Sequence, residues 1–423
     1  MRHFKELEGL RGLAAVTVVL YHFLLAFYLL AFFGPIGNPT LVQHTRFEDN
    51  LYGNPVMALL SGTFAVAIFF VLSGFVLSIK FFQTKDPSVI KSLATKRYTR
   101  LMLPALASVL ICYLLIKLGA SHTTQAAVVT QSGWLAMNWA FVPSLFDAVR
   151  NAVWGIFVSG QSAYNNVLWT MTSEFVGSFL VFGFALLFAH SKHRWFAYTL
   201  LLVILFNTWF IPFIIGMIFA DLYSKGYLQP RKRGLSAVLL VGIAIFCGGF
   251  PVGAVTNTIY SALELPVTTG INNFVLYTTI GASIAVFTVL TTTQIAKVFS
   301  MKYMSMLGRY TFSLYLVHIP ILFTMTTGLF LYFHQFMGYN RSVVVAIACS
   351  VPVLAIATFL FERYVDAPAV RFSQSIAHIY EGKREFTLPQ LAINYKDKLL
   401  LVWADVRKRL SDKFLLREED TTE

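Results

Sequence analysis

The sequence is poor in charged residues and in cysteine. Asp, Glu, Lys and Arg make up 13% of its 423 residues and apolar residues make up 57%, whereas a soluble domain averages about 25% charged residues. This excludes a soluble globular domain and predicts an all-α polytopic integral membrane protein. The three cysteines, Cys112, Cys247 and Cys349, fall in apolar runs without metal-ligand spacing, so we expect buried thiols and no metal site.

Several enzyme signatures are absent as well. The sequence contains no G-x-S-x-G elbow, P-loop, Rossmann fingerprint or zinc motif. We expect no signal peptide, because the first apolar run is too long and no small-residue cleavage site follows it. The net charge of +13 does not indicate nucleic acid, because residues 1–365 carry all of it, mostly in short loops between apolar runs.

Ten apolar segments are predicted to be transmembrane helices: 10–33, 57–80, 98–118, 167–189, 195–206, 208–224, 234–250, 271–293, 311–333 and 342–361. The loops on one side of them hold 17 Lys and Arg residues and the loops on the other side hold three. This asymmetry predicts that both termini are cytoplasmic. The two short segments between 195 and 224 are expected to form a hairpin that turns near Asn207.

Two regions differ from these segments. Residues 1–370 are predicted to form the transmembrane domain and 371–423 a charged cytoplasmic tail. Apolar residues recur at helical spacing over 391–416, which predicts an amphipathic helix on the membrane or against the loops, or alternatively a helix that binds a partner. The long outward loop 119–166 contains three tryptophans and suits a partly interfacial or re-entrant segment.

Arg11 and His22 lie inside the first apolar segment. Eleven residues bring a helix back to almost the same face and advance it ~16 Å along its axis. Arg11 is therefore expected at the cytoplasmic surface, with His22 beneath it near the middle of the bilayer. Ionisable groups at such depth are costly and usually mark a substrate, ion or proton site.

Other ionisable residues lie in the apolar segments. Glu174 is about two turns from the outer end of its apolar segment, and His318 is about two turns from the cytoplasmic end of its apolar segment. Arg97 and Arg100 lie at the start of the third apolar segment. Counting residues predicts the order Arg11, His318, His22 and Glu174 from the cytoplasm outward. Each has a less specific alternative. Arg97 and Arg100 could be topology anchors. His318 could be a structural residue, and Glu174 could form a polar contact between helices.

These residue types limit the chemistry. A histidine can act as a general base near neutral pH, because its ordinary pKa is about 6.5. Arginines can hold phosphates through charge-assisted, bidentate hydrogen bonds. The set is consistent with a metal-free reaction of a phosphorylated donor that approaches from the cytoplasm.

The same residues carry a resemblance to a family. The segments concerned are LEGLRGLAAVTVVLYHF with Arg11 and His22, FFVLSGFVLS around Ser73 and Gly74, RYTRLMLP with Arg97, Arg100 and Pro104, LWTMTSEF with Glu174, FSLYLVHIP with His318 and Pro320, and FERYVDAP with Glu362. In these segments, over about residues 5–370, the chain resembles the membrane acyltransferase 3 family of O-acyltransferases. It resembles the stand-alone form, without a fused hydrolase-like domain.

The resemblance implies transfer of an acetyl or other short acyl group from acyl-CoA to a hydroxyl, often on a cell-surface polysaccharide or its lipid-linked precursor. It implies His22 as general base, with Arg11 and Glu174 in the catalytic site. Arg97, Arg100, His318 and Ser73 are expected at the donor site, although Ser73 and Gly74 suit a close approach of helices better than a nucleophile.

The expected location is a bacterial inner membrane, and the sequence leaves the acceptor and the oligomeric state open. The main alternative is a proton-coupled secondary transporter of a glycan or small acid, which buried His and Glu residues would also suit. Transporters of that kind often contain internal repeats, and none is evident here.

Overall fold

The computed structural model describes residues 4–34 and 42–381. Every regular element in these residues is a helix, and the one β-contact among them is an isolated bridge between Arg231 and Thr292. The all-α prediction is confirmed for this part of the chain. The amphipathic helix predicted over 391–416 lies outside the described residues.

Among residues 4–34 and 42–381, seven helices are long and apolar enough to cross a membrane. They are α1 (Lys5–Phe27), α4 (Gly62–Thr84), α5 (Pro87–Lys117), η3 with α10 (Asn166–Phe188), α14 (Asn273–Thr291), α16 to α17 (Lys302–His334) and α18 to α19 (Tyr339–Tyr380). Three shorter apolar helices are α11 (Arg194–Ile204), α12 (Ile211–Ser224) and α13 (Leu235–Gly248). Every predicted segment thus has a helical counterpart, while the number of crossings and the side of the termini stay predictions.

Local signals explain where several helices begin. Asp86 accepts a hydrogen bond from the Ser88 amide over 2.9 Å, and Pro87 occupies the first turn of α5. This cap starts α5 well before residue 98, the expected start of the third segment. Ser61 caps α4 and Asn272 caps α14 in the same way.

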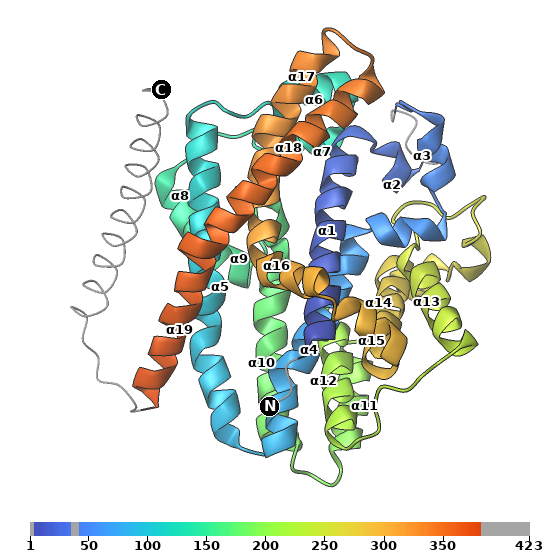
Figure 1. The fold of residues 1–423 in the computed structure, drawn as a ribbon, viewed down its shortest axis with the longest axis vertical. Helices are drawn as coiled ribbons and strands as arrows, with labels where there is room; N and C mark the ends of the chain where they lie inside the picture. The colour runs from blue at the N-terminus through green and yellow to red at the C-terminus, as the bar shows by residue number, and fades with distance from the viewer. Residues whose placement is uncertain (1–3, 35–41, 382–423) are drawn as a thin grey trace, which may run out of the picture. The chain divides into compact units, whose positions relative to one another are not determined.

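Helix α1 lies near the middle of the bundle and packs mainly against α16 (Lys302–Ile321) and α4 (Figure 1). Helices α4 and α12 approach each other closely. A Cβ atom at Gly74 would overlap the carbonyl oxygen of Phe213, and one at Gly216 would overlap that of Val71. The expectation that Gly74 permits close helix packing is therefore confirmed.

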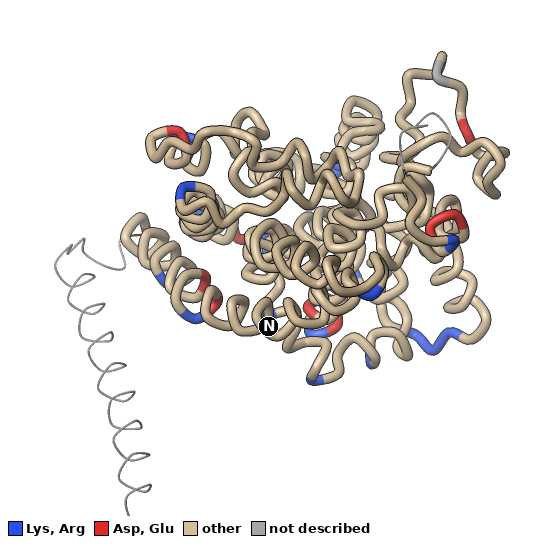
Figure 2. The backbone as a smooth tube through the Cα atoms, turned by 90° about the horizontal axis from the view of Figure 1, so that it is seen from above, with Lys and Arg blue, Asp and Glu red and all other residues tan. Residues whose placement is uncertain are grey.

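Connections of different lengths join the helices at two ends of the bundle (Figure 1). The end where α1 begins and where α4 joins α5 is named the basic end here, because Arg194 and Lys225 also lie there. The opposite end, where α1 finishes, is named the far end. Figure 2, seen along the vertical of Figure 1, shows how few stretches of the backbone carry charge.

The predicted hairpin between α11 and α12 is confirmed. Its turn contains Asn207 with φ of 58°, a left-handed conformation that Asn tolerates. Arg194 at the start of α11 and Lys225 after α12 both bond the buried carboxylate of Asp221, over 2.8 and 3.3 Å. The two basic clusters therefore meet at one end, as the charge pattern predicts.

The long connection between α5 and α10 folds back against the bundle at the far end. It contains α6 (Thr123–Thr130), α7 (Gly133–Met137) and α8 (Leu145–Arg150). Trp139 is buried and its indole N–H donates to the Tyr164 carbonyl over 2.7 Å. Trp154 is 64% exposed. The loop is thus partly buried against the bundle, and its interfacial or re-entrant character stays a prediction.

The surface of the bundle is apolar over several helices. Large apolar side chains are exposed on α11, α13 and α18 (Tyr339–Phe361), among them Val203, Leu239 and Ile356. Such surfaces suit contact with lipid in a multi-pass membrane protein. Residues up to Gln374 form one compact unit and those from Ser375 belong to a second, and the predicted domain boundary at 370 stays a prediction.

Candidate active site

His22 and His318 meet in the interior of the bundle. His22 Nδ1 lies 3.2 Å from His318 Nε2, although the residues belong to α1 and α16, which are far apart in the sequence. His318 is fully buried, and His22 is 8% exposed. The count of residues places His318 nearer the cytoplasm than His22, whereas in the structure the two rings lie side by side.

The hydrogen-bond partners assign the protons of this pair. His318 Nδ1 lies 3.1 Å from the Leu314 carbonyl, so it must be the donor and His318 Nε2 the acceptor. His22 Nδ1 lies 2.9 Å from the Val18 carbonyl and must also carry its proton, which it shares with His318 Nε2. With both rings neutral, His22 Nε2 is left unprotonated, as a general base requires.

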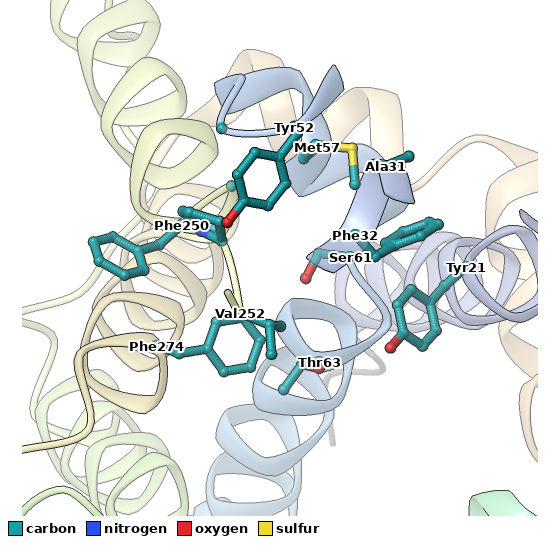
Figure 3. Close-up of a pocket in the computed structure, with 14 residues that line it drawn as sticks. Tyr21, Ala31, Phe32, Tyr52, Met57, Ser61, Thr63, Phe250, Val252 and Phe274 are labelled. Carbon is teal, nitrogen blue, oxygen red and sulfur yellow. The ribbon is translucent and has the colours of Figure 1, made fainter. Parts of the chain in front are cut away.

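Aromatic side chains surround His22. Trp134 of α7 lies 5.7 Å from it between ring centroids, and Tyr21 lies 4.9 Å away. Tyr21 also lines a small cavity of about 30 Å³ at the far end, together with Phe32, Tyr52 and others (Figure 3). That volume holds about one water molecule and is too small for a sugar ring.

A second polar centre joins α4, α5 and α10 (Thr170–Phe188). Arg97 forms an ion pair with Glu174, and its Nε donates to the Ser178 hydroxyl over 2.7 Å. Ser73 donates to the same carboxylate over 2.7 Å. The charged side chains are only 13% and 14% exposed, so the two charges compensate each other in a poorly solvated place. Ser73 is thus a hydrogen-bond donor to Glu174.

Three more arginines lie near this centre. Arg100 pairs with Asp366 over 2.6 Å, and Arg309 pairs with Glu362 over 2.8 Å. Arg11 is exposed, donates to the Gly308 carbonyl over 3.1 Å, and lies within electrostatic range of Arg100, Asp366 and Glu174. The structure therefore brings Arg11, Arg97, Arg100 and Glu174 together, as one charged cluster that is separate from the histidine pair.

A cavity of about 190 Å³ opens beside the charged cluster. Its basic lining residues are Lys96, Arg97 and Arg100, and its other walls are residues of α4, α5 and the start of α19 (Ala367–Tyr380), namely Leu77, Leu93, Val370, Ser373 and Gln374. Arg100 keeps 28% of its side chain exposed even though it is paired with Asp366. The cavity is therefore suited to an anionic group.

Glu174 lies between the basic end and the histidine pair. Thr170, one turn before it in α10, bonds the Tyr315 hydroxyl over 2.8 Å, and Tyr315 precedes His318 by one turn in α16. Helix α10 runs toward the basic end and α16 runs away from it. Glu174 is therefore nearer the basic end than Tyr315, and His318 is farther from it.

This position differs from the expected order, in which Glu174 is outermost. The count assumes that α10 begins at the outer membrane surface. Instead, the residues just before it, Asn165 and Val167, are fully buried in the bundle. Glu174, one turn into α10, is consequently deep in the protein rather than near the far end.

Comparison with known proteins identifies the family. A sequence profile described as an acyltransferase domain matches residues 4–362. The chain belongs to the membrane acyltransferase 3 family. This acyltransferase is similar to the O-acetyltransferase PaAT-1 of Phomopsis amygdali, with 27% identity over 87% of this chain and 83% of that protein. No solved structure matches it.

Some residues of the acyltransferase site do not stand out in the sequence. Ser178 follows Glu174 by four residues, a helical spacing that puts both on one face, so the motif around Glu174 could have revealed it. Asp366 lies in FERYVDAP, a segment in which the resemblance to the family rests on Glu362 rather than on Asp366. Trp134 and Asn165 carry no local signal, because only the folded loop brings Trp134 to His22 and Asn165 to the helical turn before His318.

The expectation that the reaction needs no metal stays a prediction. Within residues 4–34 and 42–381 of the acyltransferase, no group of three His, Cys, Asp or Glu side chains could hold a metal ion. Cys112 and Cys247 are buried as expected. Cys349 is exposed on α18, so the expectation of a buried thiol is wrong there.

Proposed function

We propose that the acyltransferase moves an acetyl or other short acyl group from acyl-CoA to a hydroxyl of a carbohydrate, with His22 as the general base. The observation that carries this proposal is the set of hydrogen-bond partners of the histidine pair, from which we infer that Nε2 of neutral His22 is unprotonated. His318 positions that base because its Nε2 accepts a hydrogen bond from His22 Nδ1.

The charged cluster suits the donor. Coenzyme A carries phosphates, which arginine binds through charge-assisted hydrogen bonds. We assign Arg100 and Arg11 to these phosphates, since both keep exposed surface near the cluster. Arg97 lines the cavity, but its guanidinium is already bonded to Glu174 and Ser178. We therefore assign Arg97 and Glu174 a structural role, in which their ion pair holds the cavity wall in place.

The distance from the cluster to the base suits an extended arm. Arg11 and His22 are eleven residues apart on α1, which corresponds to ~16 Å along the helix. A pantetheine arm whose phosphates rest near Arg11 would bring its thioester toward His22. Under the predicted topology the donor approaches from the cytoplasm, and the acceptor reaches His22 from the other side.

The reaction balances without a further reagent. His22 Nε2 takes the proton of the acceptor hydroxyl as its oxygen attacks the thioester carbonyl. The carbon–sulfur bond then breaks, and the coenzyme A thiolate leaves with the proton from His22. The products are the O-acyl ester and free coenzyme A. This direct transfer needs no covalent acyl-enzyme.

The name of the similar protein, an O-acetyltransferase, supports acetyl as the group and a hydroxyl as the acceptor. We propose a polysaccharide or its lipid-linked precursor as the acceptor class, and a bacterial inner membrane with cytoplasmic termini as the location. These finer assignments rest on the resemblance of the motifs rather than on any contact of the site.

Incubation of the purified protein with radiolabelled acetyl-CoA and a membrane glycan extract tests the proposal. We expect release of coenzyme A and label in the carbohydrate, and a loss of about 10²- to 10⁴-fold in His22→Gln. His193→Gln, an exposed histidine at the basic end, is the matched control and should retain wild-type activity. Equal turnover by wild type and His22→Gln would refute the base assignment, and no turnover of acetyl-CoA would favour the transporter.

A further inference from the structure

The turn of α16 that carries His318 contains a proline. In an α-helix the carbonyl of residue i accepts the N–H of residue i+4. Pro320 has no N–H, so it leaves the Leu316 carbonyl without that donor. Leu316 is fully buried, and a buried carbonyl without a donor costs about 1–3 kcal/mol.

Asn165 supplies the missing donor from another part of the chain. Its Nδ2 lies 2.9 Å from the Leu316 carbonyl oxygen and 2.5 Å from the hydroxyl of Ser108 in α5. The Ser108 hydroxyl is itself 3.4 Å from the same carbonyl. Asn165, Ser108 and Leu316 are all buried, so no bulk water competes for this carbonyl.

We propose that Asn165 is a positioning residue for the histidine pair. It completes the hydrogen bonding of the turn that Pro320 interrupts and ties that turn to α5 and to the start of η3 (Asn166–Trp169). The turn carries His318, whose Nε2 must stay 3.2 Å from His22 Nδ1. Without the amide of Asn165, the turn shifts and the proton of His22 Nδ1 loses one of its two acceptors.

The effect on activity rests on the proposed function, but the hydrogen bond itself does not. Asn165→Asp keeps the size of the side chain and removes the amide donor. We expect kcat to fall about tenfold with little change in the donor KM, because the charged cluster is untouched. Asn166→Asp is the matched control: the Asn166 amide bonds Asn138 in the loop rather than the Leu316 carbonyl, and its variant should retain wild-type kcat.

Pro320→Ala provides the decisive background, because alanine restores the backbone donor to the Leu316 carbonyl. We expect Asn165→Asp to lower kcat by less than threefold in this background, and its effect on the unfolding temperature to shrink as well. The stability measurement needs no substrate, so it separates failure of this inference from failure of the proposed function.

Equal losses from Asn165→Asp in both backgrounds, in kcat and in unfolding temperature, would overturn the inference. A wild-type kcat in Asn165→Asp would also overturn the inference, because the amide donor would then be dispensable. The functional group of Asn165 would instead be its Oδ1 atom, which has no partner among the described residues. If Pro320→Ala itself abolishes activity, the unfolding temperatures of the four variants still decide the coupling.

Discussion

Arg97 and Arg100 belong to one motif, yet the structure predicts different consequences when each is lost. Arg97 and Glu174 form an ion pair whose side chains are 13% and 14% exposed. Removing one partner of a buried pair leaves the other charge uncompensated, which costs about 3–5 kcal/mol. Arg97→Ala leaves the Glu174 carboxylate with the Ser73 hydroxyl as its remaining hydrogen-bond partner among the described residues, and we expect an unfolding temperature several degrees below that of wild type.

Arg100 is more accessible than Arg97, with 28% of its side chain exposed at the cavity. In the proposed function it binds a donor phosphate, and a hydrogen bond between charged groups contributes about 1.5–3 kcal/mol. Arg100→Ala should therefore raise the donor KM on the order of tenfold to a hundredfold. Its unfolding temperature should fall less, because Asp366 also lies within electrostatic range of Arg11.

Two measurements on purified protein in detergent separate these outcomes: the temperature at which the protein loses its monodisperse elution, and the KM for acetyl-CoA. The double variant Arg97→Met/Glu174→Met is the control, because replacing both charges by apolar side chains removes the uncompensated charge and should restore most of the stability. If Arg97→Ala unfolds at the wild-type temperature and raises the donor KM as much as Arg100→Ala does, Arg97 binds the donor and the reasoning is refuted.

Three further outcomes are expected. His318→Leu removes one acceptor of the His22 Nδ1 proton and leaves the Val18 carbonyl, so kcat should fall about tenfold; a loss as large as in His22→Gln would mean that His318 is itself the base. Gly74→Ala should lower the unfolding temperature because its Cβ meets the backbone of α12, whereas Gly183→Ala, where the space is open, should not; equal temperatures would contradict that packing. Burial raises the pKa of Glu48 above 4.5, so the folded state should lose stability as pH rises through that raised pKa. Glu48→Gln should lack this loss. If the unfolding temperatures of Glu48→Gln and wild type depend on pH in the same way, the expectation is wrong.

The sequence by itself determined the helices and much of the chemistry. Apolar runs of membrane length predict a helix wherever they occur, since the bilayer leaves backbone groups no other partner. The hairpin at Asn207 followed from the charges on its flanks, and Arg194 and Lys225 do meet at Asp221. Arg11 and His22 are close in sequence, so helical geometry alone predicts their common face.

Only the tertiary structure decided which groups meet. Counting residues from the start of a segment gives depth only if the helix begins at the membrane surface, and α10 begins inside the bundle. For that reason Glu174 meets Arg97 near the basic end, rather than an acceptor at the far end.

The histidine pair depends on the same kind of long-range contact. His22 and His318 are 296 residues apart, and the turn of Pro320 is completed by Asn165, which is 151 residues from Leu316. Local patterns identify an ionisable residue or a proline, but a hydrogen bond between two distant segments depends on how the whole bundle packs. The sequence therefore predicted His22 as a base, and the fold supplied the partners that set its proton.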